Sequence, residues 1–141
     1  MKYLGIDYGT RRIGLAASDE SGSIAFPRQV IPTSPTAVKE ILSYIQSEAV
    51  GAVVVGEWVN KDGEQNVVEG QVDTFVAELE SLGVLVFRER EWFSSHQAAL
   101  QNFDQKSTLT TRPDRATREL LDAQAAAIIL QRYLDKVNKV G

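Results

Sequence analysis

One acidic residue, Asp7, stands inside a short segment that otherwise has the character of a buried β-strand. The segment reads Gly-Ile-Asp-Tyr-Gly-Thr over residues 5–10. Glycines on either side allow a ligand or another stretch of backbone to approach closely. Charged side chains rarely occupy strand interiors without a partner, so we favour a functional role for Asp7. The alternative is that Asp7 caps the following turn or pairs with Arg11 or Arg12.

The composition narrows the chemistry that could accompany this acid. The chain has no cysteine, which excludes disulfides, thiolate zinc sites and a thiol nucleophile. His96 is the single histidine. It could act as a general acid, but we favour a surface position at the start of a helix. Carboxylates therefore remain the main candidates, and their oxygens suit magnesium.

Alternating apolar residues predict three β-strands in the first part of the chain, over residues 2–8, 13–18 and 24–31. The tight connection at residues 9–12 indicates a hairpin. Pro27 cannot donate a hydrogen bond to a neighbouring strand, so the third strand should lie at an edge of the sheet. We expect these three strands to be antiparallel.

Helices and strands alternate in the rest of the chain. Ser34 and Pro35 suit the N-cap and the first residue of a helix, and Gly83 suits the position after a helix. The remaining predictions are a buried strand at 52–55, a helix at 68–82, a strand at 84–87, a short helix from Ser94 or Ser95 to Leu100, a loop at 104–115 and a helix at 116–134. This order predicts a mixed-sheet α/β protein that forms a single domain over residues 1–141.

The overall charge argues against a protein that simply coats nucleic acid. The net charge is -4 and the pI is about 5.0, whereas such domains are strongly basic. A cluster of carboxylates that holds cations can nevertheless attract phosphate. The apolar run at the N-terminus contains Asp7, so it resembles neither a signal peptide nor a membrane span. We therefore expect a cytoplasmic protein without membrane association.

Several blocks of the sequence resemble the YqgF family of Holliday-junction-resolvase-like and ribosomal-RNA-processing nucleases. The opening block, residues 4–19, is closely similar to the start of those proteins, and the resemblance extends over nearly the whole chain. The further blocks are residues 53–56 with Asn60 and Gly63, Glu91 with residues 93–95 and Ala98, and residues 121–122 with 126–134.

The resemblance implies a ribonuclease H-like fold, with a mixed five-stranded sheet of three antiparallel and then two parallel strands and with helices on both faces. It implies a metal-dependent endonuclease that hydrolyses phosphodiester bonds, in 5′-end maturation of the small-subunit ribosomal RNA precursor. By this resemblance Asp7, Glu91 and Asp122 are the catalytic carboxylates, and they would hold Mg²⁺ or Mn²⁺. Such convergent carboxylates suit either ion and could support two-metal hydrolysis.

The chain departs from the family pattern at two of these blocks. Arg90-Glu91-Trp92 replaces the common Asp-Glu-Arg, and Gly56-Glu57-Trp58 replaces Gly-Leu-Pro. Glu57 follows the buried strand that should lie beside the strand of Asp7. It could therefore be a fourth metal ligand that compensates for the acid missing at position 90, or it could be a loop acid that points to water.

Other residues are candidates for binding the substrate. Phosphates could be bound by five arginines, although scattered surface arginine is the common alternative: Arg11, Arg12, Arg112, Arg115 and Arg118. Trp58 and Trp92 could stack on unpaired bases or pack in the interior. Glu119, one turn before Asp122, could join the metal site or lie in solvent.

Nucleic acid is the expected partner, with precursor ribosomal RNA favoured over branched DNA, and the chain is expected to be a monomer or a homodimer. Three alternatives to a ribosomal RNA nuclease stay open. The first is a catalytically silent nucleic-acid or ribosome-associated binding protein, and the second is a Holliday-junction resolvase that acts on branched DNA. The third is an ATP-binding protein, because Asp7-Tyr8-Gly9-Thr10 is similar to the first phosphate loop of actin-like ATPases.

Overall fold

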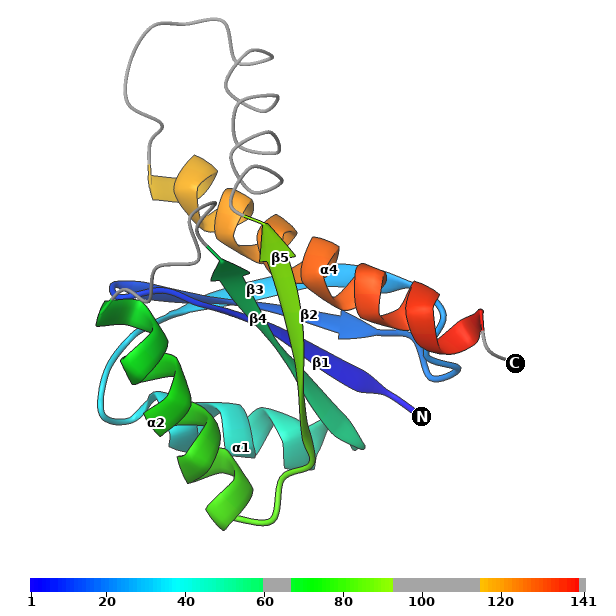
Figure 1. Ribbon diagram of the computed structural model, residues 1–141, viewed down its shortest axis with the longest axis horizontal. Helices are drawn as coiled ribbons and strands as arrows, with labels where there is room; N and C mark the ends of the chain where they lie inside the picture. The colour runs from blue at the N-terminus through cyan, green and yellow to red at the C-terminus, as the bar shows by residue number, and fades with distance from the viewer. Residues whose placement is uncertain (60–66, 93–114, 140–141) are drawn as a thin grey trace, which may run out of the picture.

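A five-stranded mixed sheet forms the centre of the protein (Figure 1). The computed structural model describes the backbone of residues 1–59, 67–92 and 115–139, and the side chains of residues 1–56, 70–89 and 120–139. The strands are β1 (Tyr3–Tyr8), β2 (Arg12–Ser18), β3 (Ala25–Pro32), β4 (Ala52–Val59) and β5 (Val86–Trp92), in the order β3-β2-β1-β4-β5. The first three are antiparallel, whereas β4 is parallel to both β1 and β5. The predicted topology is confirmed.

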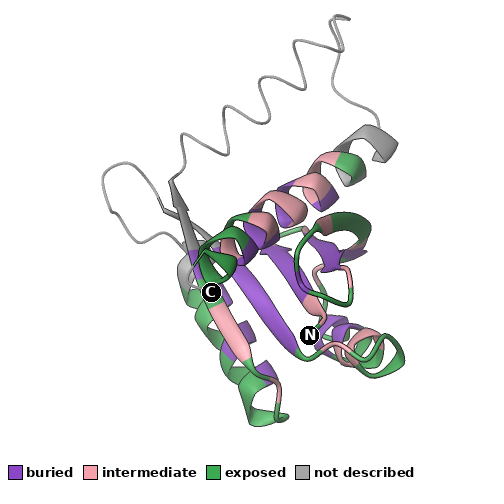
Figure 2. Cartoon of the chain, turned by 90° about the vertical axis from the view of Figure 1, so that its right-hand side faces the viewer, coloured by how far each residue is buried: buried purple, intermediate pink, exposed green. Residues whose placement is uncertain are grey.

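Helices cover both faces of this sheet, as expected. On one face lie α1 (Ala37–Ser47) and α2 (Val67–Ser81), and on the other lies α4 (Arg115–Asn138), which runs diagonally across the strands (Figures 1 and 2). Within the described parts of the chain, no helix is both long and apolar enough to cross a membrane.

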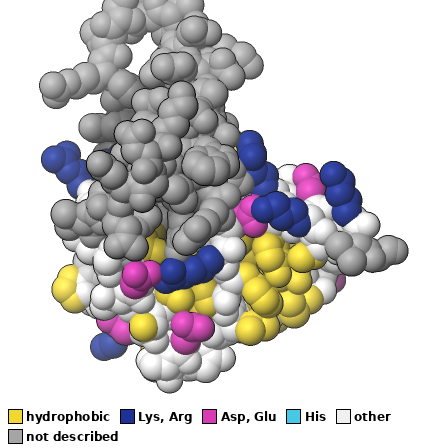
Figure 3. Space-filling model, viewed as in Figure 1, with side chains coloured by type: hydrophobic (Ala, Val, Ile, Leu, Met, Phe, Trp, Pro, Cys, Tyr) yellow, Lys and Arg dark blue, Asp and Glu magenta, His cyan; other side chains and the backbone are white. Residues whose placement is uncertain are grey.

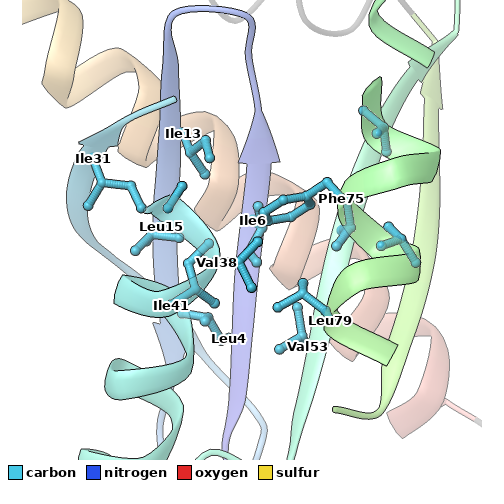
Figure 4. Close-up of a cluster of buried hydrophobic side chains, with 14 residues drawn as sticks. Leu4, Ile6, Ile13, Leu15, Ile31, Val38, Ile41, Val53, Phe75 and Leu79 are labelled. Atoms are coloured by element: carbon cyan, nitrogen blue, oxygen red, sulfur yellow. The ribbon is translucent and has the colours of Figure 1, made fainter. Parts of the chain in front are cut away.

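Strand alternation divides the buried residues between the two layers. Leu4 and Ile6 of β1 point toward α1 and α2, where they join a cluster with Val38 and Leu79 (Figure 4). On the other face, Ala16 and Val54 pack with a second cluster on α4, which consists of Ala126, Ile129, Leu130 and Leu134. The residues between Leu4 and Tyr8 that face α4 are therefore Gly5 and Asp7.

The first helix begins later than the sequence predicted. Helix α1 starts at Ala37 with Thr36 as its N-cap, so the assignment of Ser34 and Pro35 to the cap and first helical residue was wrong. The backbone N–H of Thr36 donates to the Ser34 hydroxyl, and the N–H of Ala37 donates to the Ser34 carbonyl. These bonds hold residues 34–36 in a turn that precedes the helix.

Two strands and a helix also differ from their predicted bounds. The segment 84–87 was predicted as a strand, but β5 begins only at Val86. The reason is that the N–H of Val84 still bonds the carbonyl of Leu79, while Gly83, at φ 87°, occupies the predicted position after the helix. Strand β4 continues past residue 55 to Val59, and α4 extends from 115 to 138 rather than from 116 to 134. The predicted helix at 94–100 and the loop at 104–114 lie outside the described residues.

Candidate active site

Asp7 lies on the α4 face of β1 between two glycines on the neighbouring strands. Its Cα pairs with Gly14 of the antiparallel β2 and with Gly56 of the parallel β4. The residue is 8% exposed. Because neither neighbour has a side chain, the space on both sides of the Asp7 carboxylate is left to whatever approaches from α4.

Helix α4 approaches the sheet at these same glycines. A Cβ atom on Gly14 would lie 2.1 Å from the carbonyl oxygen of Asp122, and one on Gly56 would lie 2.2 Å from Cδ1 of Ile129. No other residue fits at position 14 unless the helix moves. The close approach therefore sets the backbone of Asp122 directly over Gly14, the cross-strand neighbour of Asp7, so that two of the three predicted catalytic residues lie at neighbouring positions of the packed layers.

Asp122 forms an ion pair with one of the predicted phosphate-binding arginines. The Arg12 Nε atom donates to Oδ2 of Asp122 at 2.6 Å, and the two side chains are 35% and 27% exposed. Arg12 begins β2, whereas Asp122 lies on α4, so the pair joins the rim of the sheet to the helix. A site with a buried Asp7 thus opens to solvent at Arg12 and Asp122.

A second buried acid was missed from the sequence. Glu89 is 4% exposed, and its Cα pairs with Gly56 on the side away from Asp7. Its carboxylate accepts a hydrogen bond from Nζ of Lys136 on α4. Ile129 fills the space over Gly56 and so lies between this ion pair and Asp7. In the sequence Glu89 belongs to the charged run at residues 88–91, which suggests exposure. Its spacing of two residues from Phe87 could have indicated that both side chains lie on the same, buried face of the strand.

The backbone of Glu57 and Glu91 is described, but their side chains are not. Glu57 follows Gly56 in β4 and pairs with Arg90, whereas Glu91 lies within β5, rather than after it as predicted, and pairs with Trp58. The carboxyl ends of β1, β4 and β5 meet at one edge of the sheet because these strands are parallel. The roles of Glu57 and Glu91 as metal ligands stay predictions.

The remaining predicted binding residues fall near this edge or outside the described part. Arg11 is exposed in the β1–β2 turn. Arg115 and Arg118 lie in the first turns of α4, as does Glu119, but their side chains are not described. The side chains of Trp58 and Trp92, in β4 and β5, are not described either. Arg112 and His96 lie outside the described residues.

The donor set suits a hard divalent cation, although only part of it is described. Among the described residues there is no group of three or more His, Asp or Glu side chains that could hold a metal ion. Of the predicted metal ligands, Asp7 and Asp122 are the ones whose side chains are described. A cavity of about 460 Å³ lies on the other side of the sheet, between α1 and α2, lined by residues such as Tyr8, Thr33, Gln71 and Phe75. None of the predicted site residues whose side chains are described lines it.

Comparison with known proteins gives similarity over nearly the whole chain. The sequence model of a family described as "RuvX: Holliday junction resolvase" matches residues 1–136. A protein of Nitratidesulfovibrio vulgaris (strain Miyazaki F) named "Putative pre-16S rRNA nuclease" is 40% identical over 96% of this chain and 94% of its own. A protein of Chlorobaculum tepidum with the same name is 36% identical over 95% of this chain and 93% of its own.

Two solved structures share the fold. The RuvC protein of T. thermophilus, solved in complex with a Holliday junction substrate, gives a TM-score of 0.54 at 20% identity and covers 95% of this chain and 93% of its own. The fowlpox virus resolvase, solved with Holliday junction DNA, gives a TM-score of 0.56 at 9% identity and covers 97% of this chain and 99% of its own. At these identities the likeness supports the ribonuclease H-like fold.

We expect Gly14→Ala to destabilise the protein. The added methyl group would collide with the Asp122 carbonyl, and overpacking of this kind costs roughly 1–3 kcal/mol. Gly70→Ala is the matched control: a Cβ there meets nothing within 4 Å, so in the interior of α2 the change should stabilise by up to about 1 kcal/mol. Urea unfolding measures both free energies, and equal stability of Gly14→Ala and wild type would contradict the close approach.

Proposed function

The chain belongs to the RuvX family of Holliday junction resolvases, and on this basis we propose that Asp7 and Asp122 form the centre of its nuclease site. This membership confirms the resemblance found in the sequence. Nuclease or resolvase is the activity that the family and its relatives carry in their names. The proposed substrate is the precursor of 16S ribosomal RNA, after the names of relatives up to 40% identical.

The observation that supports this proposal best is the position of Asp122 over Gly14, the cross-strand neighbour of the buried Asp7. A buried acid would be costly in a strand that served packing alone. Asp7 faces α4, which can approach the sheet this closely because the neighbouring strand position is a glycine. The same helix carries the second acid, Asp122, over that glycine. Acids that separate elements of the fold bring close together are typical of catalytic sites.

The chain's own residues suggest a division of roles. Asp7, Asp122 and Glu91 would hold Mg²⁺ or Mn²⁺, with Asp7 fixed by the sheet and Asp122 by the helix. When bound, such a cation lowers the pKa of a coordinated water and offsets the charge of the phosphodiester. Arg12 lies against Asp122 at the open side and is placed to contact a phosphate of the entering strand.

Strand alternation favours Glu91 over Glu57 as the third ligand. On β5, position 91 follows Phe87 and Glu89 in the row that faces α4, the layer of Asp7. On β4, position 57 follows Val53 and Val55, which belong to the row that faces α1 and α2. Glu57 at the end of β4 would need a departure from regular alternation to reach the same site.

The distribution of charge indicates from which side nucleic acid approaches. Helix α2 contains four acids and no base, a net charge of -4, which by itself equals the charge of the whole chain. Helix α4 contains four bases and three acids, a net charge of +1. A polyanion is therefore repelled from the α1–α2 layer and admitted on the α4 face, where Asp7 and Asp122 lie.

We expect Asp7→Asn to abolish cleavage while the protein stays folded. Loss of even an outer partner of a metal ligand costs roughly 10–100-fold, so loss of the proposed ligand itself should cost more. The assay compares 16S precursor RNA with a four-way DNA junction, each with Mg²⁺ and with Mn²⁺, and circular dichroism checks the fold. Cleavage of the RNA at the wild-type rate would rule out this site, and cleavage of the junction alone would assign branched DNA as the substrate.

Titration of Mn²⁺ by calorimetry should separate the two glutamates. We expect Glu91→Gln to weaken Mn²⁺ binding, because position 91 lies in the row that faces α4. Glu57→Gln should bind Mn²⁺ like the wild type. Loss of affinity in Glu57→Gln alone would reverse the assignment and make Glu57 the compensating ligand.

Arg12→Gln should strengthen Mn²⁺ binding in the absence of nucleic acid. The guanidinium places a positive charge next to Asp122 and occupies one of its oxygens, so its removal favours a second cation there. Arg11→Gln, an exposed neighbour outside this ion pair, is the control and should leave Mn²⁺ affinity unchanged. Arg12→Gln should also reduce the salt dependence of RNA binding by about one unit of slope. An unaltered Mn²⁺ affinity in Arg12→Gln would show that the ion pair and the metal do not compete.

A further inference from the structure

Three aromatic side chains form a partly exposed patch on the α4 face of the sheet. The rings of Phe87 and Tyr133 are stacked, with centroids 5.4 Å apart and an angle of 25°. Tyr3 meets Tyr133 edge-on at 5.7 Å. We call Tyr3, Phe87 and Tyr133 the aromatic patch. Each of the three is only partly buried, so the patch offers ring surface to solvent.

Exposed apolar residues lie close in sequence to two of the three members of the aromatic patch. Leu85, two residues before Phe87, is 53% exposed, and Val137, one helical turn after Tyr133, is 39% exposed. On the face seen in Figure 3, apolar side chains gather beside β5 and α4, with both basic and acidic side chains at their border. An exposed apolar surface of this kind marks an interaction site more often than chance exposure does.

The patch and the proposed nuclease site share one layer and one helix. Phe87 lies in the β5 row that continues to Glu89 and position 91, and Tyr133 lies on the same helix as Asp122. Eleven residues of α-helix span about 16 Å, which is the approximate separation of the patch from Asp122 along α4. A strand of nucleic acid that lies along this helix can therefore reach both places.

Cations accompany the aromatic rings on the same helix. Arg132 and Lys136 of α4, and Lys139 directly after its end, follow one another at spacings of four and three residues, which places them along one stripe. Lys136 also donates to Glu89, the buried acid beside Phe87 in β5. Asp135 is the single acid between residues 127 and 139, which leaves that stretch with a net charge of +2. A tyrosine is uncharged at physiological pH and does not repel a phosphate. Burial, and next Tyr3 and Glu89, raise the pKa of Tyr133 further.

We propose that the aromatic patch is a stacking platform for unpaired bases of a single-stranded nucleic acid, whose phosphates lie along the Arg132–Lys136–Lys139 stripe. The inference rests on the proposed function, because it identifies an unpaired stretch of the substrate beside the cleavage site. Stacking accepts any base, whereas the cations contact the backbone, so the platform would bind without strict sequence preference. The rings and the net positive charge of residues 127–139 together favour this occupant over a second copy of an acidic chain.

The test measures binding of fluorescein-labelled single-stranded RNA by anisotropy, in EDTA and at several salt concentrations. Phe87→Leu and Tyr133→Leu keep an apolar side chain but remove a ring, and each should raise Kd at least about fivefold. The slope of log Kd against log salt should stay that of the wild type, because no phosphate contact is lost. Tyr133→Phe keeps the ring and should bind like the wild type.

Phe26→Leu is the matched control for the loss of a ring. Phe26 is 47% exposed on β3, at the opposite edge of the sheet, so its replacement should leave RNA binding unchanged. Melting temperatures show whether each variant is folded, and the ring-retaining Tyr133→Phe gives a binding test even if Tyr133→Leu unfolds.

The stacking platform would be overturned if folded Phe87→Leu bound RNA with wild-type affinity. It would also be overturned if light scattering showed that the wild-type protein is a dimer and that Phe87→Leu is a monomer. Because binding is measured without a divalent cation, its outcome is separate from that of the cleavage assay. A protein that binds through the patch but does not cleave would contradict the proposed function and leave the platform intact.

Discussion

The close approach of α4 to the sheet is the constraint on which the rest of the structure depends. It is possible because glycines occupy the two strand positions that the helix contacts: Gly14 lies under the backbone of Asp122, and Gly56 lies under the side chain of Ile129. The same contact brings the two arms of the proposed site together, since Asp7 belongs to the sheet and Asp122 to the helix. Tight packing at positions 14 and 56 thus determines the geometry of the acids as well as the stability of the layer.

Local patterns in the sequence predicted the sheet well but predicted contacts across the layers poorly. Alternation, Pro27 and the short buried run at 52–55 were sufficient for the presence of the strands and for the edge position of β3, whereas the parallel pairing was implied by the family resemblance. The start of α1 was misplaced because Ser34 and Pro35 satisfy the statistical pattern of a helix start while the turn before Ala37 uses the same residues.

The chemical site was only partly readable from the sequence for a related reason. Asp7 could be found, because an acid in an apolar strand is conspicuous by itself. The pairing of Arg12 with Asp122, and of Glu89 with Lys136, depends on where α4 crosses the sheet. No spacing along the chain encodes that crossing. The acidic composition argued against a nucleic-acid partner. That argument no longer applies to the α4 face, because the four acids of α2 lie on the opposite side of the sheet.

The position of α4 after all five strands has a consequence for how the protein is made. During synthesis the strands leave the ribosome before the helix that covers Ala16 and Val54, and α4 packs against every one of those strands. Until it docks, the nascent sheet exposes one apolar face and lacks Asp122. Such long-range packing is slow and leaves intermediates open to aggregation. A partly synthesised chain that lacks α4 therefore also lacks the second acid of the proposed site, which is complete only once α4 has docked on the sheet.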